Sequence, residues 1–137
     1  MSVKIKKLTY QKNLSKWVSW LNDKTVTKFS EQRFQKHNTK SQQKFIKYKI
    51  LDKKSICFKI YYKNEFIGVV ELANIDNNHK NCEIMYLIGE KKYWGKGIAT
   101  KAIGLAVKFA FNNLNMKNIY AGTYSSNISS QKVLKKN

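Results

Sequence analysis

Hydrophobic positions repeat with two different periods along this chain, and the period changes from one segment to the next. Where every second residue is apolar, the pattern predicts a strand, because successive side chains of a strand point to opposite faces. Where apolar residues recur three or four positions apart, as at Leu14, Trp17, Val18 and Leu21, it predicts an amphipathic helix. The predicted strands are 3–8, 56–62, 66–75, 82–88 and 118–124, and the predicted helices are 14–21, 41–50, 97–112 and a last one from about 127 or 129.

Short polar segments separate these elements and constrain the topology. Residues 63–65 and 76–79 are polar turns between consecutive strands, which favours antiparallel hairpins. Ser41 is the predicted N-cap of the second helix. The resulting order, β-α-α-β-β-β-α-β-α, belongs to the α/β class and fills residues 1–137 as a single domain.

Composition excludes several classes of protein. Hydrophobic residues make up 42% of the 137, which indicates a folded core and argues against a disordered tail. No apolar run reaches the roughly 20 residues that a membrane span needs. The first five residues lack the apolar region of a secretory signal. We therefore expect a cytoplasmic protein that does not associate with a membrane.

The net charge of +19 is the strongest bias in the composition. A polyanionic partner such as nucleic acid is one interpretation. However, Arg33 is the single arginine, whereas nucleic-acid-binding proteins usually use arginine for bidentate contacts. We therefore favour lysines spread over solvated faces, with no specific nucleic-acid partner. The same charge would help to attract a phosphate-rich cofactor.

The cysteines and histidines do not form a recognisable metal site. Cys57 and Cys82 both fall in predicted strands, so we expect two reduced, buried thiols rather than a disulfide or a metal pair. His37 and His79 stand alone, with no second ligand at metal-binding spacing. A zinc site is not predicted.

The segment with the most chemical information is the loop between strand 82–88 and helix 97–112. Gly95 and Gly97 lie at its end, and the free N–H groups at the start of a helix bind phosphate well. Glycine also lets the backbone approach a pyrophosphate without a Cβ in the way. The spacing is neither that of a Walker P-loop nor a complete G-x-G-x-x-G motif. Taken alone, the loop predicts either a phosphate site or an ordinary turn.

A family resemblance makes this segment more specific. Lys92-x-x-Gly95-x-Gly97 resembles the Arg/Gln-x-x-Gly-x-Gly/Ala signature of the GNAT N-acetyltransferase superfamily, and residues 83–100 resemble its ribosomal-protein-acetyltransferase-like branch. The resemblance implies a mixed, mostly antiparallel sheet flanked by helices. It also implies that acetyl-CoA is the acyl donor and that a primary amine is the acceptor, with no metal.

The resemblance also assigns roles to individual positions. Backbone groups of residues 93–98, the glycine loop, would hold the CoA pyrophosphate. The end of the preceding strand would pair with the pantetheine arm like an added strand. An N–H near Leu87 or Ile88 would stabilise the oxyanion. For Tyr93 and Trp94 we favour packing of the loop over stacking on adenine. The CoA-binding residues implied in this way are Tyr86, Leu87, Ile88, Lys92, Tyr93, Trp94, Gly95, Lys96, Gly97, Ile98, Asn127 and Ser130.

Two carboxylates are candidates for the general base that deprotonates the amine. Glu83 and Glu71 lie in adjacent predicted strands. Either could accept a proton through water, and either could be a solvated strand residue. We favour Glu83, because strand alternation places residues 83, 85 and 87 on one face, beside the expected position of the thioester.

The end of the chain leaves three functions open. After Asn137 the family pattern would continue with two further strands, so we expect a domain that is incomplete at its C-terminus. Many relatives have a tyrosine acid seven residues after the Asn of the Asn-x-x-Ser segment, and here that position is Leu134. The leading hypothesis is acetyl transfer to a small molecule, an amino sugar or a protein N-terminus. The alternatives are a catalytically silent CoA-binding fragment and a basic nucleic-acid-binding module, and assembly as a homodimer is open.

Overall fold

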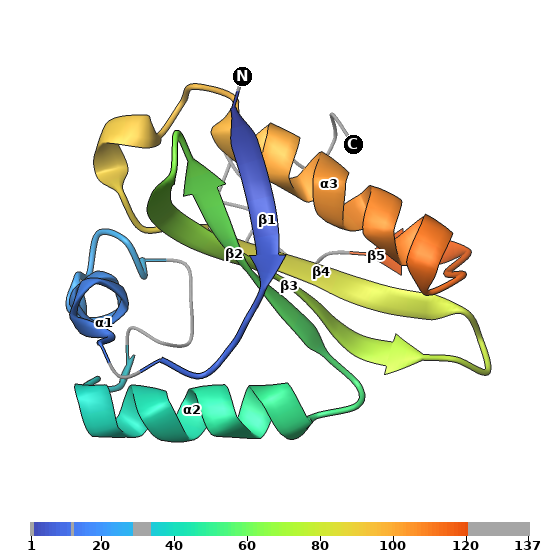
Figure 1. Cartoon of the computed structure of the whole chain (residues 1–137), viewed down its shortest axis with the longest axis horizontal. Helices are drawn as coiled ribbons and strands as arrows, with labels where there is room; N and C mark the ends of the chain where they lie inside the picture. The colour runs from blue at the N-terminus through green and yellow to red at the C-terminus, as the bar shows by residue number, and fades with distance from the viewer. Residues whose placement is uncertain (1, 12, 29–33, 121–137) are drawn as a thin grey trace.

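The computed structural model describes residues 2–11, 13–28 and 34–120 (Figure 1). The elements are β1 (Val3–Lys7), α1 (Ser15–Asn22), α2 (Thr39–Leu51), β2 (Ile56–Tyr62), β3 (Glu65–Asp76), β4 (Asn81–Ile88), a short 3-10 helix η2 (Lys91–Tyr93), α3 (Ile98–Asn113) and β5 (Asn118–Tyr120). These bounds agree with the sequence prediction to within a few residues. The predicted last helix, and the predicted strand beyond Tyr120, lie outside the described residues.

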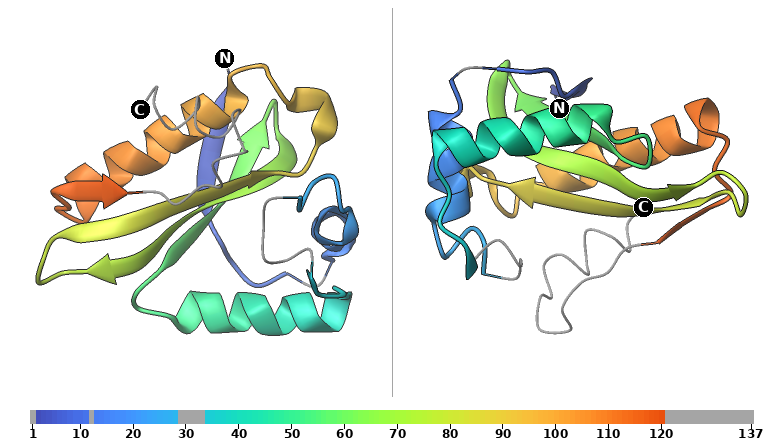
Figure 2. Two further views of the ribbon diagram at one scale, coloured as in Figure 1. Left: turned by 180° about the vertical axis from the view of Figure 1, so that it is seen from behind. Right: turned by 90° about the horizontal axis from the view of Figure 1, so that it is seen from below.

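Within the described residues the strands form one sheet in the order β1-β2-β3-β4-β5. Neighbouring strands are antiparallel except β4 and β5, which run parallel. Helices α1 and α2 cover one face of this sheet and α3 covers the other (Figures 1 and 2). The predicted fold, a mixed and mostly antiparallel sheet flanked by helices, is therefore confirmed.

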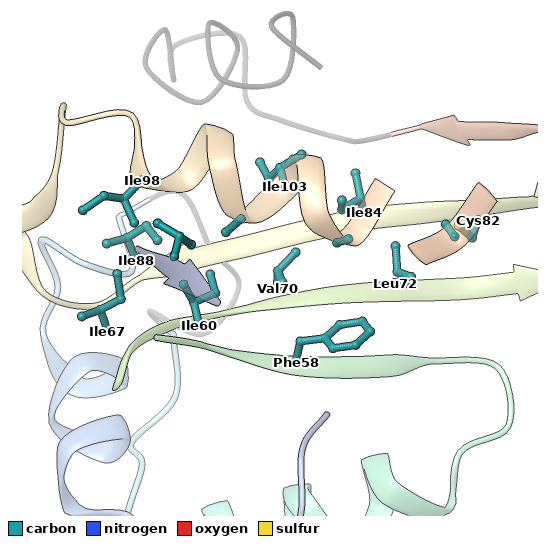
Figure 3. Packing of buried hydrophobic residues seen from close by; sticks show 14 of the residues in the cluster. Phe58, Ile60, Ile67, Val70, Leu72, Cys82, Ile84, Ile88, Ile98 and Ile103 are labelled. Atoms are coloured by element: carbon teal, nitrogen blue, oxygen red, sulfur yellow. The ribbon is translucent and has the colours of Figure 1, made fainter. Parts of the chain in front are cut away.

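Each face of the sheet has its own hydrophobic core. Alternate residues of β2 belong to different cores. Phe58 and Ile60 pack in the core under α3, and Cys57 packs in the core under α1 and α2. Apolar residues of α3, including Ile98 and Ile103, complete the first core (Figure 3). These buried side chains fix α3 against the sheet and thereby fix the loop that precedes it.

The N-terminus of α2 differs from its prediction by one turn. Asn38, rather than Ser41, is the N-cap, and its side chain accepts a hydrogen bond from the Ser41 N–H at 2.8 Å. The Ser41 hydroxyl oxygen in turn accepts from the Asn38 N–H at 3.1 Å. The prediction was wrong because serine at the third helical position completes a capping box as well as it caps a helix.

The two cysteines lie on opposite faces of the sheet. Cys57 packs in the core under α1 and α2, Cys82 packs in the core under α3, and both are buried and free. The prediction of two buried cysteines that do not pair with each other is therefore confirmed. In the described part of the chain, no helix is long and apolar enough to cross a membrane.

Candidate active site

The loop between β4 and α3 ends in a backbone conformation that suits glycine. Gly95 and Gly97 have φ angles of 75° and 79°, which are unfavourable for residues with a Cβ. Gly97 is the N-cap of α3 and provides no side chain to the helix, so no side-chain cap bonds the first N–H groups of α3. Such a helix start, with its partial positive charge, can bind an anion.

Two aromatic residues fix this loop to the domain. The Tyr93 ring packs edge-on against Tyr62, with 5.0 Å between centroids, and its hydroxyl donates to Glu65 at 2.8 Å. The Trp94 indole N–H donates to the carbonyl oxygen of Ile88 at 2.8 Å. Both side chains therefore hold the loop in place, which agrees with the packing role favoured from the sequence.

Carboxylates pair with several lysines beside the loop. The Lys92 and Lys16 ammonium groups lie 3.4 and 3.3 Å from Glu65, and Lys91 lies 2.7 Å from Asp23. Hydrogen bonds from Tyr93 and then from Lys16 lower the pKa of Glu65, and the Glu65 charge raises the pKa of Lys92. Lys92 thus has an acidic partner within the domain, whereas Lys96 is exposed between the two glycines.

The edge of β4 that faces β5 is paired along part of its length. Pairing with β5 covers Asn81 to Glu83, and within the described residues no strand pairs with that edge from Ile84 to Ile88. The Gly89 N–H donates to Ile67 of β3, so antiparallel alternation directs the polar backbone groups of Ile88 and Tyr86 away from β3. An extended ligand could therefore hydrogen bond to these two residues as an added strand would.

A cavity of about 180 Å³ lies between the sheet, α1 and α2. Its walls are mostly apolar, with a few polar groups. The lining residues are Trp17, Leu21, Thr27, Gln42, Phe45, Cys57, Val69, Glu71, Met85, Tyr86 and Leu87. The cavity and the β4 edge therefore share residues Tyr86 and Leu87, so a ligand along this edge would lie beside the cavity.

Glu71 is the carboxylate that the structure places in this cavity. It lies opposite Cys57 of β2 and opposite Met85 of β4. Its Oε2 lies 2.8 Å from the Lys49 ammonium, and the two side chains are only 12% and 17% exposed. Both members of the pair are thus largely shielded from solvent.

Glu83 has different surroundings. Its Oε2 accepts a hydrogen bond from Asn74 at 2.9 Å, and this bond is exposed to solvent. It lies two residues along β4 from Met85, which corresponds to about 7 Å along a strand. Glu83 does not line the cavity. The other proposed positions in the C-terminal segment, Asn127 and Ser130, lie outside the described residues.

Several residues at the cavity were not identified as site residues from the sequence, among them Gln42 and Cys57, which line it, and Lys49, which pairs with Glu71. Gln42 and Lys49 lie seven positions apart on the same face of α2 as Ile46, where a lipophilic residue would be the ordinary choice. Burial raises the pKa of the Cys57 thiol to about 12, so this lining residue is neutral at physiological pH. Polar residues in a helical stripe that is otherwise apolar were the available signal.

The potential metal-ligating side chains among the described residues are dispersed. Among them, no group of three or more histidine, cysteine, aspartate or glutamate side chains is arranged to hold a metal ion. His79 instead lies 2.8 Å from Asp76 in the β3–β4 turn.

Comparison with known proteins gives a family and a fold. The family model described as "Acetyltransferase (GNAT) domain" matches residues 4–137. Spermidine N(1)-acetyltransferase of Escherichia coli K12 is 36% identical over 63 residues, which are 46% of this chain and 33% of that protein. The uncharacterised N-acetyltransferase p20 of Bacillus licheniformis is 34% identical over 71 residues, which are 52% of this chain and 39% of that protein.

The fold of this chain also resembles that of a solved structure. Spermidine N-acetyltransferase from Vibrio cholerae, in complex with CoA and spermine, superposes with a TM-score of 0.84 at 20% identity. The match covers 98% of this chain and 78% of that one. The sequence matches to the curated relatives, by contrast, span well under half of the length of those proteins.

Proposed function

The chain belongs to the GNAT acetyltransferase family, and we propose that it transfers an acetyl group from acetyl-CoA to a primary amine. One observation carries the proposal. The helix start without a side-chain cap at Gly97, the end of β4 that no described strand covers and the cavity that contains Glu71 lie along one path, because the loop follows Ile88 and the cavity is lined by Tyr86 and Leu87. This path has a place for a phosphate group, an extended arm and an amine, in that order.

In this proposal the glycine loop holds the phosphate end of the donor. The N–H groups at the start of α3, together with Gly95 and Gly97, approach the pyrophosphate. The exposed Lys96 adds positive charge. Asn127 and Ser130 would contribute hydrogen bonds to the same ligand, by resemblance to the family. The assignments of Lys92, Tyr93, Trp94 and Ile98 rest on backbone contacts, since the side chains of Lys92, Tyr93 and Trp94 have partners within the domain.

The β4 edge positions the thioester. Tyr86 and Ile88 direct backbone groups outward, toward the pantetheine arm, and Leu87 lies between them at the cavity wall. The Ile88 carbonyl oxygen already accepts from Trp94, so the N–H is the group of Ile88 that faces the thioester. The Ile88 N–H is the better placed of the two oxyanion donors proposed from the sequence, because alternation directs the Leu87 N–H toward β3.

The amine in the cavity attacks the thioester carbonyl carbon, so that a C–N bond forms and the C–S bond breaks. Glu71 accepts the proton that the amine loses, directly or through one water, and the CoA thiolate leaves and is protonated from solvent. Glu71 is preferred to Glu83 in this role because it lines the cavity. Glu83 remains the alternative base.

The acceptor is proposed only as a primary amine. The matched spermidine acetyltransferases of Escherichia coli and Vibrio cholerae point to polyamines, whereas the resemblance of residues 83–100 to the ribosomal-protein-acetyltransferase-like branch points to a protein N-terminus. An amino sugar is the third class. A cavity of about 180 Å³ accommodates a small acceptor, or one end of a larger one.

We also place the enzyme in the cytoplasm, because its buried, unpaired thiols suit a reducing compartment. Assembly as a homodimer is supported by exposed apolar residues on α2, where Tyr48 and Leu51 are 65% and 79% exposed. Sedimentation velocity would measure the oligomeric state directly.

Release of free thiol from acetyl-CoA, measured across a panel of amines, tests the proposed reaction. The panel contains a polyamine, an amino sugar and a peptide with a free N-terminus. We expect at least one amine to raise the release well above the rate without acceptor. CoA binding without turnover on any acceptor would instead identify a catalytically silent CoA-binding domain.

A further inference from the structure

Two polar groups at the cavity are not used by the proposed acetyl transfer. One is the ammonium group of Lys49, which pairs with the lining residue Glu71, and the other is the amide of Gln42, which lines the cavity itself. They lie seven residues apart on one face of α2, which is about two helical turns. Lys49 therefore lies beside the proposed base Glu71, and Gln42 lies roughly 10 Å from Lys49 along the helix axis.

Lys49 cancels the negative charge of the cavity. Its Nζ lies 2.8 Å from Glu71 Oε2 and 5.7 Å from the centroid of the Phe45 ring. Among the lining residues, Glu71 is the one carboxylate. A second ammonium group on the acceptor would therefore find Glu71 already paired and Lys49 close by. In a partly buried site, repulsion between like charges is much stronger than in water.

Gln42 offers a hydrogen-bond donor that no residue in the described part of the chain uses. Its residue is 3% exposed, and its Nε2 has no hydrogen-bond partner among the described residues. A buried amide N–H without a partner is unfavourable, so such a group in a ligand cavity is best explained by an oxygen atom of the ligand. Hydroxyl and carbonyl oxygens accept this hydrogen bond, whereas an ammonium group cannot.

We propose that the cavity selects a small amine that also carries a hydroxyl or carbonyl oxygen, with Gln42 binding that oxygen and Lys49 excluding a second ammonium group. Amino alcohols and amino sugars have this chemistry, and polyamines do not. This selectivity rests on the proposed function, because it takes the cavity as the acceptor site. The net charge of +19 acts in the same direction, since it repels polycations at long range.

Two acceptors of equal length separate these chemistries. Putrescine has an amine at each end of a four-carbon chain, and aminobutanol has a hydroxyl in place of one amine. Binding of each to the CoA-saturated protein is measured by calorimetry in the parent, Lys49→Met and Gln42→Leu. Lys44→Met is the matched control, because Lys44 is an exposed lysine on the same helix. Circular dichroism checks that each variant is folded.

We expect the parent and Lys44→Met to bind aminobutanol about tenfold more tightly than putrescine, the usual scale for one unmade hydrogen bond in a polar site. Lys49→Met should remove most of this preference by freeing Glu71 for the second ammonium group. Gln42→Leu should weaken the binding of aminobutanol about tenfold and leave the binding of putrescine nearly unchanged. If Lys49→Met does not fold, Glu71→Gln serves instead, and it should shift the preference further toward aminobutanol.

The outcomes separate this selectivity from the acetyl transfer on which it rests. The inference is overturned if the parent prefers putrescine or binds neither amine. It is also overturned if Lys49→Met and Gln42→Leu leave the preference for aminobutanol unchanged. Thiol release from acetyl-CoA is measured with both amines in parallel. Turnover without the expected preference leaves the proposed function intact, and the expected preference without turnover supports the cavity selectivity while rejecting the proposed reaction.

Discussion

At the residue scale, two carboxylates in adjacent strands have different surroundings although their sequence contexts are similar. Glu71 lies in a cavity and pairs with Lys49, whereas Glu83 is half-buried outside the cavity and bonds to Asn74. Both were candidate bases from the sequence. Strand alternation favoured Glu83, but alternation gives only the face of the sheet and not the distance along it. The position of the cavity along β4 depends on how α1 and α2 pack on the sheet, and strand alternation carries no information about that packing.

Replacing Glu71 by glutamine should lower kcat about a hundredfold, the usual effect of losing a general base. The reason is that glutamine keeps the shape of the side chain but cannot accept the proton. CoA affinity should stay near the parent value. The loss should shrink at high pH, where the amine deprotonates without help. Steady-state kinetics across pH provide the measurement.

Glu83→Gln is the matched control for this experiment, because it makes the same change in the neighbouring strand. It should retain near-parental turnover. The reverse result, with Glu83→Gln inactive and Glu71→Gln active, would assign the base to Glu83. If neither substitution matters, water takes the proton and the enzyme contributes positioning.

The Cys57 thiol should make the protein less stable at alkaline pH. Burial raises its pKa from 9.0 to about 12 in the folded state. Between these values the unfolded chain loses the proton while the folded chain keeps it, so stability falls as pH rises above about 9. The loss should be about 1 kcal/mol between pH 8 and pH 10.

Urea unfolding of the parent and of Cys57→Ala, measured at both pH values, isolates this effect. The alanine variant lacks the titrating group, so its stability should fall less over the same interval. Parallel losses in the two proteins would show that other groups cause the alkaline destabilisation.

At the scale of elements, the order of strands and helices followed from the sequence because burial imposes regular periods. Residues 56–62 alternate between the two cores, and α3 has a broad apolar face that fits against the sheet. The turn at Lys63 and Asn64 was also expected, and both residues have positive φ angles. Each of these features depends on neighbours in sequence.

The composition of the cavity could not be predicted in the same way. Gln42 and Lys49 on α2 meet Glu71 on β3 only after α2 packs beside the sheet, and no local period records that contact. The glycine loop was predictable because its backbone requirement is local, with positive φ at Gly95 and Gly97. By contrast, the side chains of Lys92 and Tyr93 both bind Glu65, which lies in β3, far from the loop in sequence.

Substitution of Gly97 by valine should abolish stabilisation by CoA. The parent should gain about 2.7 kcal/mol when CoA is present at a hundred times its Kd, and its Tm should rise accordingly. A branched side chain at Gly97 would stand where the pyrophosphate must approach the helix start. Thermal unfolding of each variant with and without CoA measures the shift against its own baseline.

Asn115→Val is the matched control for Gly97→Val. Asn115 also has a positive φ, 55°, but it follows the opposite end of α3. Valine there should cost backbone strain without affecting the loop, so the shift by CoA should persist. If Gly97→Val is stabilised as much as the parent, the phosphate end of the ligand does not bind at this loop.

At the scale of the whole molecule, the dominant feature is the excess of 27 basic over 8 acidic residues. In the described part of the chain, the carboxylates Glu65, Glu71 and Asp23 are each paired with lysine, and many other lysines are exposed. Such a surface attracts anions without selecting among them. It is compatible with an acetyl-CoA-dependent enzyme and gives no sequence preference for nucleic acid.

Duplex DNA should therefore bind weakly, with little dependence on its sequence, and binding should weaken steeply as salt rises. Fluorescence anisotropy with two unrelated duplexes, over a range of salt concentrations, measures both properties. Tight binding to one sequence at physiological salt would instead favour a nucleic-acid-binding module over solvated lysines.

If this chain moves an acetyl group from CoA to an amine, as we propose, the acetylated amine is the product to detect. The protein is incubated with acetyl-CoA labelled with carbon-13 in the acetyl group and with the amine panel, and the products are analysed by mass spectrometry. We predict an amine that gains one labelled acetyl group, at a rate that Glu71→Gln reduces. Labelled free acetate with no acetylated amine, or the same yield without protein, would contradict the claim.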